Sequence, residues 1–97
     1  MFQILSSPSA LGDIDWSRKT EQTIIFDRIE EQLLHEPSTE TRNRKKLRPN
    51  RVAEWELRIG EYRVFYDVDA EADTVEVKMV GHKERDKLIV RGKEYAL

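Results

Sequence analysis

The sequence contains no cysteine, which excludes disulfide bonds, thiol nucleophiles and thiolate metal sites. It also contains no apolar run close to the roughly 20 residues that span a bilayer, and its first residues lack the basic start and apolar stretch of a signal peptide. We therefore expect a protein of the reducing cytoplasm that does not meet a membrane. No phosphate-binding glycine loop, serine-hydrolase elbow or set of residues with metal-ligand spacing is present, so no metal and no cofactor are expected.

Charge is what the sequence has in abundance. Charged residues make up 37% of its 97 residues, and acids outnumber bases by enough to give a net charge of -2. This length predicts one domain, residues 1–97, with a single small core. The net charge argues against nucleic-acid binding by the molecule as a whole.

The positive charge is nevertheless concentrated in one segment, residues 42–51. It contains six basic residues and no acid: Arg42, Arg44, Lys45, Lys46, Arg48 and Arg51. Residues 38–53 otherwise have the composition of a loop. Such a run is either a solvated loop or a surface for an acidic partner, and the sequence alone leaves both interpretations open.

The first part of the chain predicts a short strand followed by two helices. Phe2 to Leu5 is apolar, and Ser7 and Pro8 form a helix-start signal, because a serine hydroxyl caps a helix and proline suits its first position. From about residue 17 to residue 36 an apolar stripe recurs at helical period. Pro37 ends this pattern. We expect the two helices to form a hairpin that lies on a sheet.

Residues 54–59 and 62–68 have the strongest strand pattern in the chain, because apolar and polar residues alternate in both. They are separated by Gly60 and Glu61, and glycine at the first position suits a type II′ turn of two residues. This turn predicts three cross-strand pairs on one apolar face: Ile59 with Tyr62, Leu57 with Val64 and Trp55 with Tyr66.

The same register places Arg58 opposite Arg63 on the other face. Like charges directly opposite each other destabilise a sheet by about 0.2–1 kcal/mol. One interpretation is that the pair receives an anion, since guanidinium groups bind phosphate with two-pronged geometry. The other is that the arginines are solvated, or are paired with Glu56 and Asp67.

A third strand is predicted over residues 74–80. Its alternation places Val75, Val77 and Met79 inward and Glu76, Lys78 and Val80 on the other face. If the alternation continues, His82 shares a face with Lys78 and the two arginines. Residues 88–90 are either a short strand or part of a terminal helix. The predicted fold class is therefore α+β, with a short N-terminal strand, a helical hairpin and an antiparallel meander of three to four strands.

Three segments of the sequence resemble motifs of one family, the RelE/ParE superfamily of toxins from bacterial toxin–antitoxin pairs. Its signature L-R-x-G-x-Y-R-V-x-Y is matched by residues 57–66, Leu-Arg-Ile-Gly-Glu-Tyr-Arg-Val-Phe-Tyr. A preceding K-L segment resembles residues 44–47, and the pattern G-x-[KR]-x-R after the last long strand resembles residues 81–85. The similarity covers nearly the whole chain and implies the RelE/ParE fold.

The resemblance also implies roles for individual residues. In RelE-like nucleases the hairpin arginine stabilises the reacting phosphate, and Arg63 stands at that place. Lys83 stands where a second cation follows the last strand. The sequence departs from that pattern at Glu54 and Glu56, which replace two lysines, and at Ile89, which replaces a base-stacking tyrosine.

RNA cleavage by the RNA's own 2′-hydroxyl needs a base, an acid and cations on the phosphate, but no metal. Arg58 and Arg63 would clamp the phosphate, while His82 and Glu56 would transfer protons, as a glutamate and a histidine do in another branch of the superfamily. The candidate catalytic residues are Glu56, Arg58, Arg63, His82 and Lys83. The candidate RNA- or partner-binding residues are Arg44, Lys45, Lys46, Arg48, Arg51, Lys78 and Arg85.

The leading functional hypothesis is therefore a RelE-like toxin that inhibits translation by cleaving mRNA on the ribosome, a metal-independent endoribonuclease. Its partners would be a cognate antitoxin, the ribosome and mRNA, and the pair would serve plasmid stabilisation. Two alternatives stay open, because the superfamily contains both activities. The chain is either a ParE-like inhibitor of DNA gyrase, or an inactive member that only binds its antitoxin.

Overall fold

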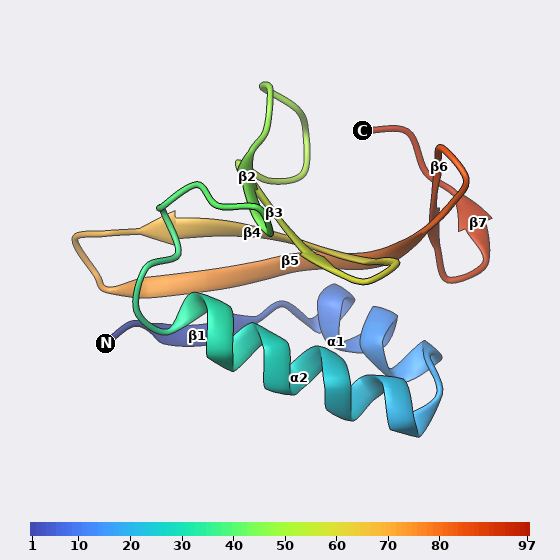
Figure 1. The fold of residues 1–97 in the computed structure, drawn as a ribbon, viewed down its shortest axis with the longest axis horizontal. Coiled ribbons are helices and arrows are strands. Elements are labelled where there is room, and N and C mark those ends of the chain that lie inside the picture. The colour runs from blue at the N-terminus through green and yellow to red at the C-terminus, as the bar shows by residue number, and fades with distance from the viewer.

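In the computed structural model, which describes all 97 residues, seven strands form one sheet and two helices cover one of its faces (Figure 1). The sheet order is β2-β3-β4-β5-β6-β7, and β1 pairs in parallel with β5. The elements in chain order are β1 (Gln3–Ser6), α1 (Pro8–Trp16), α2 (Lys19–Leu33), β2 (Arg44–Lys46), β3 (Trp55–Ile59), β4 (Tyr62–Asp69), β5 (Thr74–Glu84), β6 (Lys87–Val90) and β7 (Lys93–Glu94).

This architecture confirms the predicted α+β class and the predicted order of elements. The sheet is larger than the expected meander of three to four strands, because β2 and β7 form as well. The basic segment contributes β2 to one edge, and the C-terminal residues form the hairpin β6–β7 rather than a helix. Neither helix is both long enough and apolar enough to cross a membrane.

The two helices begin and end where local chemistry directs them. The hydroxyl of Ser7 caps α1 by accepting a hydrogen bond of 3.1 Å from the backbone N–H of Ala10, and Pro8 occupies the first turn. The second helix ends at Leu33, earlier than the sequence pattern predicts. Pro37 follows and is fully buried, so the chain turns back toward the sheet at this point.

The hairpin of β3 and β4 has the predicted register. Trp55 pairs with Tyr66, and Ile59 pairs with Tyr62 next to the turn. Gly60 has φ of +56°, whereas Glu61 does not have a positive φ, as a type II′ turn requires. A side chain at residue 60 would meet no neighbour within 4 Å, so backbone conformation alone selects glycine there.

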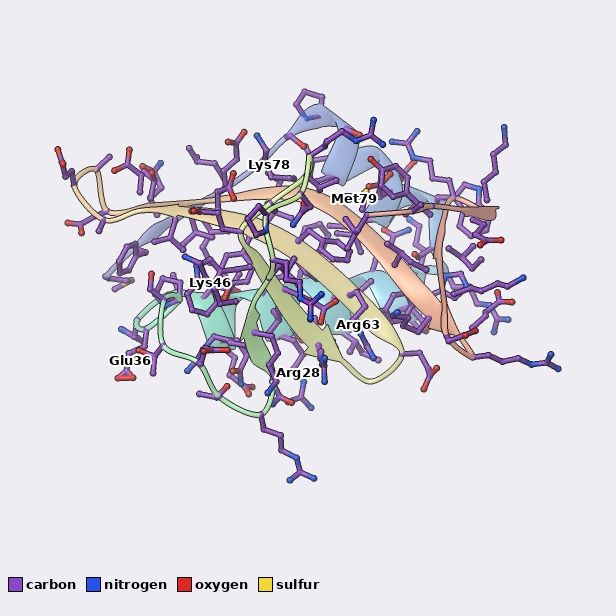
Figure 2. All side chains as sticks on the ribbon, turned by 90° about the horizontal axis from the view of Figure 1, so that it is seen from above. Arg28, Glu36, Lys46, Arg63, Lys78 and Met79 are labelled. Atoms are coloured by element: carbon purple, nitrogen blue, oxygen red, sulfur yellow. The ribbon has the colours of Figure 1, made fainter.

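A β-bulge interrupts the pairing of β4 with β5. Tyr66 pairs with Val77, but Phe65 pairs with Met79, so Lys78 is an extra residue in β5. Side chains of a strand alternate between the two faces of the sheet, so one extra residue places every later side chain of β5 on the opposite face from the one predicted. The prediction that Met79 lies inward and Val80 outward is therefore wrong. Val80 packs in the main core, whereas Met79 lies on the helix-free face (Figure 2).

Two apolar clusters lie on opposite faces of the sheet. The main cluster has 13 buried residues and fills the space between the helices and the sheet. A smaller cluster of Ala53, Phe65, Met79 and Leu88 lies on the helix-free face, next to the side chains of the basic segment and the C-terminal tail. Much of the face that the sequence marks as polar is therefore a second core, and charged side chains remain near the β3–β4 turn and beside the basic segment.

Candidate functional site

The charged region of the helix-free face next to the β3–β4 turn is centred on two arginines of this hairpin. Arg58 and Arg63 are direct cross-strand partners, as the sequence predicts. Arg63 lies close to the end of the hairpin in Figure 2. Its Nη1 donates hydrogen bonds to the carbonyl oxygens of Gly60 (2.8 Å) and Tyr62 (2.9 Å). These bonds hold the guanidinium group over the turn without an acidic partner.

Arg58 has an acidic partner of its own. Its Nε donates a hydrogen bond of 3.0 Å to the carboxylate of Glu56, and the side chain of Glu56 is only 9% exposed. This is the pairing that one of the two interpretations of the sequence anticipated. The carboxylate of Glu56 therefore neutralises Arg58 and is almost closed to solvent.

Two lysines flank this group on the same face. Lys45 is the cross-strand neighbour of Glu56 in β2. Lys83 lies two residues beyond Gly81, the partner of Arg63, and its backbone N–H donates to the carbonyl oxygen of Glu61 (2.8 Å). The arrangement brings Glu56, Arg58, Arg63 and Lys83 into one region, as the sequence analysis expected.

His82 lies on the other face of the sheet, so its predicted position beside the arginines is wrong. It pairs with Tyr62, and their rings make an edge contact with centroids 6.3 Å apart. Its Nε2 lies 2.8 Å from a carboxylate oxygen of Glu84. The bulge at Lys78 is the cause, because without the extra residue His82 would follow the alternation onto the face of Arg63.

Among the side chains of the basic segment, residues 42–51, one is buried in the fold and others are exposed. Arg44 is buried, and its guanidinium group donates to the carbonyl oxygens of Thr39 (2.9 Å) and Gln32 (2.8 Å). It joins the end of α2 to the loop that follows, so its predicted role in partner binding is wrong. Lys46 lies 5.4 Å from the ring centre of Trp55 and 3.9 Å from the carboxylate of Glu54.

Two exposed cations of the segment, Arg48 and Arg51, lie beside Lys78 of the bulge. Arg48, Arg51 and Lys78 line one groove of about 590 Å³. Arg51 and Lys78 also line an adjoining groove. Lys78 also forms an ion pair of 3.4 Å with Glu76. Arg85 lies elsewhere, exposed in the β5–β6 turn with φ of +61°. The tertiary structure thus adds Lys78 to the basic surface and leaves Arg85 outside it.

The largest cleft, about 1010 Å³, lies on the helix side, between α2 and the β3–β4 turn. Trp16 and Ile24 are exposed at this cleft, and Tyr62 lines it. Burial, and then the nearby carboxylate of Glu21, raise the pKa of Tyr62 above its ordinary value. Three of the predicted catalytic residues, Arg58, His82 and Lys83, also line this cleft, whereas Glu56 and Arg63 do not. The sequence does not predict the cleft itself. The available signal was Ile24, an apolar residue adjacent to the buried stripe of α2 but not part of it.

No group of three or more histidines and acids lies close enough together to hold a metal ion. What the site can do chemically therefore follows from its cations and its one buried carboxylate. Arg63 and Lys83 can contact an anion, whereas Glu56 is already bonded to Arg58.

Comparisons with known proteins give one family and several similar folds. The model of the family described as ParE toxin of type II toxin-antitoxin system, parDE, matches residues 4–87. No curated protein sequence matches the chain significantly. The chain is similar to the RelBE2 toxin–antitoxin complex from Mycobacterium tuberculosis, with a TM-score of 0.73 and 24% identity over 84% of this chain and 98% of that one.

Two further solved structures share the fold at lower similarity. The archaeal RelE–RelB complex from Pyrococcus horikoshii OT3 has a TM-score of 0.63 and 15% identity, over 87% of this chain and 97% of that chain. The intact Escherichia coli RelBE toxin–antitoxin complex has a TM-score of 0.60 and 23% identity, over 88% and 100%. At these identities the likeness concerns the fold.

Proposed function

Because the chain belongs to the ParE toxin family of type II toxin–antitoxin systems, we propose that it inhibits bacterial growth by binding a protein target, DNA gyrase, and does not cleave RNA. The observation that carries this proposal is the state of the arginine face. Glu56 is bonded to Arg58 and is nearly buried, and His82 lies on the opposite face. Neither expected proton-transfer group is therefore available beside Arg63, and general acid–base catalysis requires such a group within hydrogen-bond reach.

An antitoxin is the second partner that we propose. The similar structures named above are complexes of a toxin with its antitoxin. On this chain one groove is lined by four cations, Lys46, Arg48, Arg51 and Lys78, and by two acids, Glu54 and Asp67. The groove therefore has an excess of positive charge on a protein of net charge -2. An acidic segment of the antitoxin would be complementary to it.

The proposal is tested with the purified full chain in two parallel assays. One measures supercoiling of a relaxed plasmid by DNA gyrase, and the other maps new 5′ ends on ribosome-bound mRNA by primer extension. We expect supercoiling to be inhibited in proportion to the concentration of the chain and no new 5′ ends to form. Ribosome-dependent cleavage with full gyrase activity would overturn the proposal.

Cleavage of mRNA on the ribosome is the second candidate, and a specific observation favours it. Arg63 has no acidic partner, and Lys83 lies on the same face nearby. These two cations could stabilise the charge that develops on a reacting phosphate. The ribosome would then have to supply the missing proton transfer.

Arg63→Ala separates the two candidates. If the chain cuts mRNA, this variant should lose both cleavage and growth inhibition while keeping its melting temperature close to that of the wild type. Arg42→Ala, which removes an exposed cation elsewhere, is the matched control. If the chain acts on gyrase by contacts elsewhere, both variants should stay toxic.

A further inference from the structure

The arginine face contains three cations, Lys45, Arg58 and Arg63, and one nearly buried acid, Glu56. Lys45, Arg58 and Arg63 surround Glu56 on three neighbouring strands, since Lys45 is its cross-strand partner and Arg63 is the partner of Arg58. Phe65, its partner on the other side, is fully buried in the second core. Glu56 therefore lies between an apolar cluster and a group of cations.

The ion pair between Glu56 and Arg58 is strongly asymmetric in its exposure. The side chain of Arg58 is 46% exposed, whereas that of Glu56 is 9% exposed. The packing of the sheet holds the carboxylate, and the guanidinium group covers it from the solvent side. Arg63 uses only Nη1 in its bonds to the turn, so its other nitrogens remain available.

We propose that Glu56 is a specificity-determining residue that occupies the anion site of this face and so excludes the phosphate groups of nucleic acid. A carboxylate and a phosphate oxygen make the same charge-assisted bonds to guanidinium. While Glu56 is bonded to Arg58, an incoming phosphate meets a neutralised arginine and a fixed negative charge. Removing that one charge leaves three cations on a surface that is already formed.

This inference agrees with the proposed action on gyrase, and it conflicts with cleavage of mRNA at the arginine face, because the reacting phosphate would then have to enter that face. It concerns which anions the arginine face excludes. Binding of those anions is measured on the isolated chain, without gyrase or ribosomes. The inference would fail if Glu56 were only a stabilising partner of Arg58, and that failure would leave the gyrase assay unaffected.

The test is Glu56→Gln, which keeps the shape and a hydrogen-bond acceptor but removes the charge. Its control is Glu54→Gln, which removes the same charge from an exposed side chain that is 62% accessible and lies 3.9 Å from Lys46. The probe is a short fluorescein-labelled oligouridylate, followed by anisotropy over a range of salt concentrations, and melting curves establish that all variants are folded.

We expect Glu56→Gln to bind the oligonucleotide about fivefold more tightly than the wild type at low salt, with a dependence of log Kd on log salt that is steeper by about one. Glu54→Gln should remain within about twofold of the wild type, because its charge is distant from the arginines. Inorganic phosphate should compete with the oligonucleotide for Glu56→Gln.

The double variants Glu56→Gln with Arg58→Gln and Glu56→Gln with Arg63→Gln show whether the gain depends on the arginines. We expect each to lose the gain. Equal affinities for Glu56→Gln and Glu54→Gln would overturn the proposal, as would a gain that persists without either arginine.

A second measurement keeps the proposal testable if Glu56→Gln folds poorly. In the wild type, the NMR signal of Arg58 Nε–H should not move when inorganic phosphate is added, because Glu56 already occupies that donor. A saturable shift of this signal in the wild type would show that phosphate reaches Arg58, and the proposal would be wrong.

Discussion

At the scale of single residues, Tyr66 joins the sheet to the segment that leaves α2. Its side chain is fully buried, its ring stacks on Trp55 with centroids 6.1 Å apart, and its hydroxyl donates a hydrogen bond of 2.7 Å to the carbonyl oxygen of Pro37. The structure buries this hydroxyl, because Pro37 folds over the end of the sheet.

Removing this hydroxyl should therefore destabilise the protein measurably. Tyr66→Phe leaves the carbonyl of Pro37 without its donor and should lower the free energy of unfolding by about 1–3 kcal/mol. Tyr66→Ala should cost about 3–5 kcal/mol, because the ring is also lost from the core. Urea denaturation of both variants checks this. A cost close to zero for Tyr66→Phe would mean that water replaces the bond.

The raised pKa of Tyr66 determines how the free energy of unfolding changes at alkaline pH. Burial raises the pKa of Tyr66 well above its ordinary value of 10.0. Above about pH 10 the unfolded chain loses this proton and the folded chain keeps it, so the folded state becomes less stable as pH rises. Below that pH the contribution is complete and constant. The slope for one such group is about 1.4 kcal/mol per pH unit.

Urea midpoints measured from about pH 9 to about pH 11 test this linkage. The wild type should lose stability more steeply than Tyr66→Phe, which has no proton to lose at this position. Parallel curves for the two proteins would exclude Tyr66 as the source of the alkaline loss.

At the scale of elements, one ion pair fixes the C-terminal hairpin to α1. Arg91, in the β6–β7 turn, donates a hydrogen bond of 2.7 Å to the carboxylate of Asp13 and another to the carbonyl oxygen of Ser9. The side chain of Asp13 is 3% exposed, and its other oxygen accepts from the backbone N–H of Val80, just beyond the bulge. Asp13 thus binds both β5 and the C-terminal hairpin.

Breaking this pair should cost more than an exposed ion pair does. Arg91→Ala leaves the carboxylate of Asp13 buried and unpaired, and we expect a loss of about 2–4 kcal/mol of unfolding free energy. Lys93→Ala, two residues away and exposed, is the control and should change stability by less than about 0.5 kcal/mol. Equal effects of the two substitutions would show that the pair contributes little.

At the scale of the whole molecule, the distribution of charge matters more than its sum. The net charge is -2, yet Arg48, Arg51 and Lys78 line one groove on the helix-free side of the sheet. A basic surface on an acidic protein selects an acidic partner locally without attracting nucleic acid over its whole surface. This distribution fits an antitoxin with an acidic segment better than a general RNA-binding protein.

Association with the antitoxin that we propose should therefore depend on salt. We expect Arg48→Glu combined with Arg51→Glu to slow association by about tenfold at low salt and much less at high salt, because electrostatic steering is screened. Lys19→Glu combined with Lys93→Glu, two exposed changes outside the groove, makes the same change in net charge and is the control. Stopped-flow or surface-binding rates for the cognate antitoxin measure this. Rates independent of salt would contradict it.

The hairpin and the helix starts could be predicted from the sequence because their causes are local. The alternation of residues, the glycine at residue 60 and the Ser7–Pro8 cap each act within a few residues, so the register of β3 and β4 and the opposition of Arg58 and Arg63 followed directly. The family motifs in residues 57–66 added the fold class. The α+β architecture was therefore determined by the sequence alone.

Only the tertiary structure decided which side chains meet at the site. The bulge at Lys78 cannot be found from the pattern of residues in β5. It depends on contacts distant in sequence, such as the bond from Val80 to Asp13 and the close passage of β6 over Gly81, where a Cβ atom would lie 2.7 Å from the carbonyl oxygen of Ile89. That single extra residue moved His82 to the opposite face of the sheet.

The burial of Glu56 has the same kind of origin. Whether a strand carboxylate is solvated or covered depends on what packs beside it, and here the second core around Phe65 and the guanidinium group of Arg58 cover it. The sequence determined that acids and arginines share one face, because alternation along a strand is local. The fold decided that Glu56 is buried and forms an ion pair with Arg58, because burial is a property of the whole packed molecule.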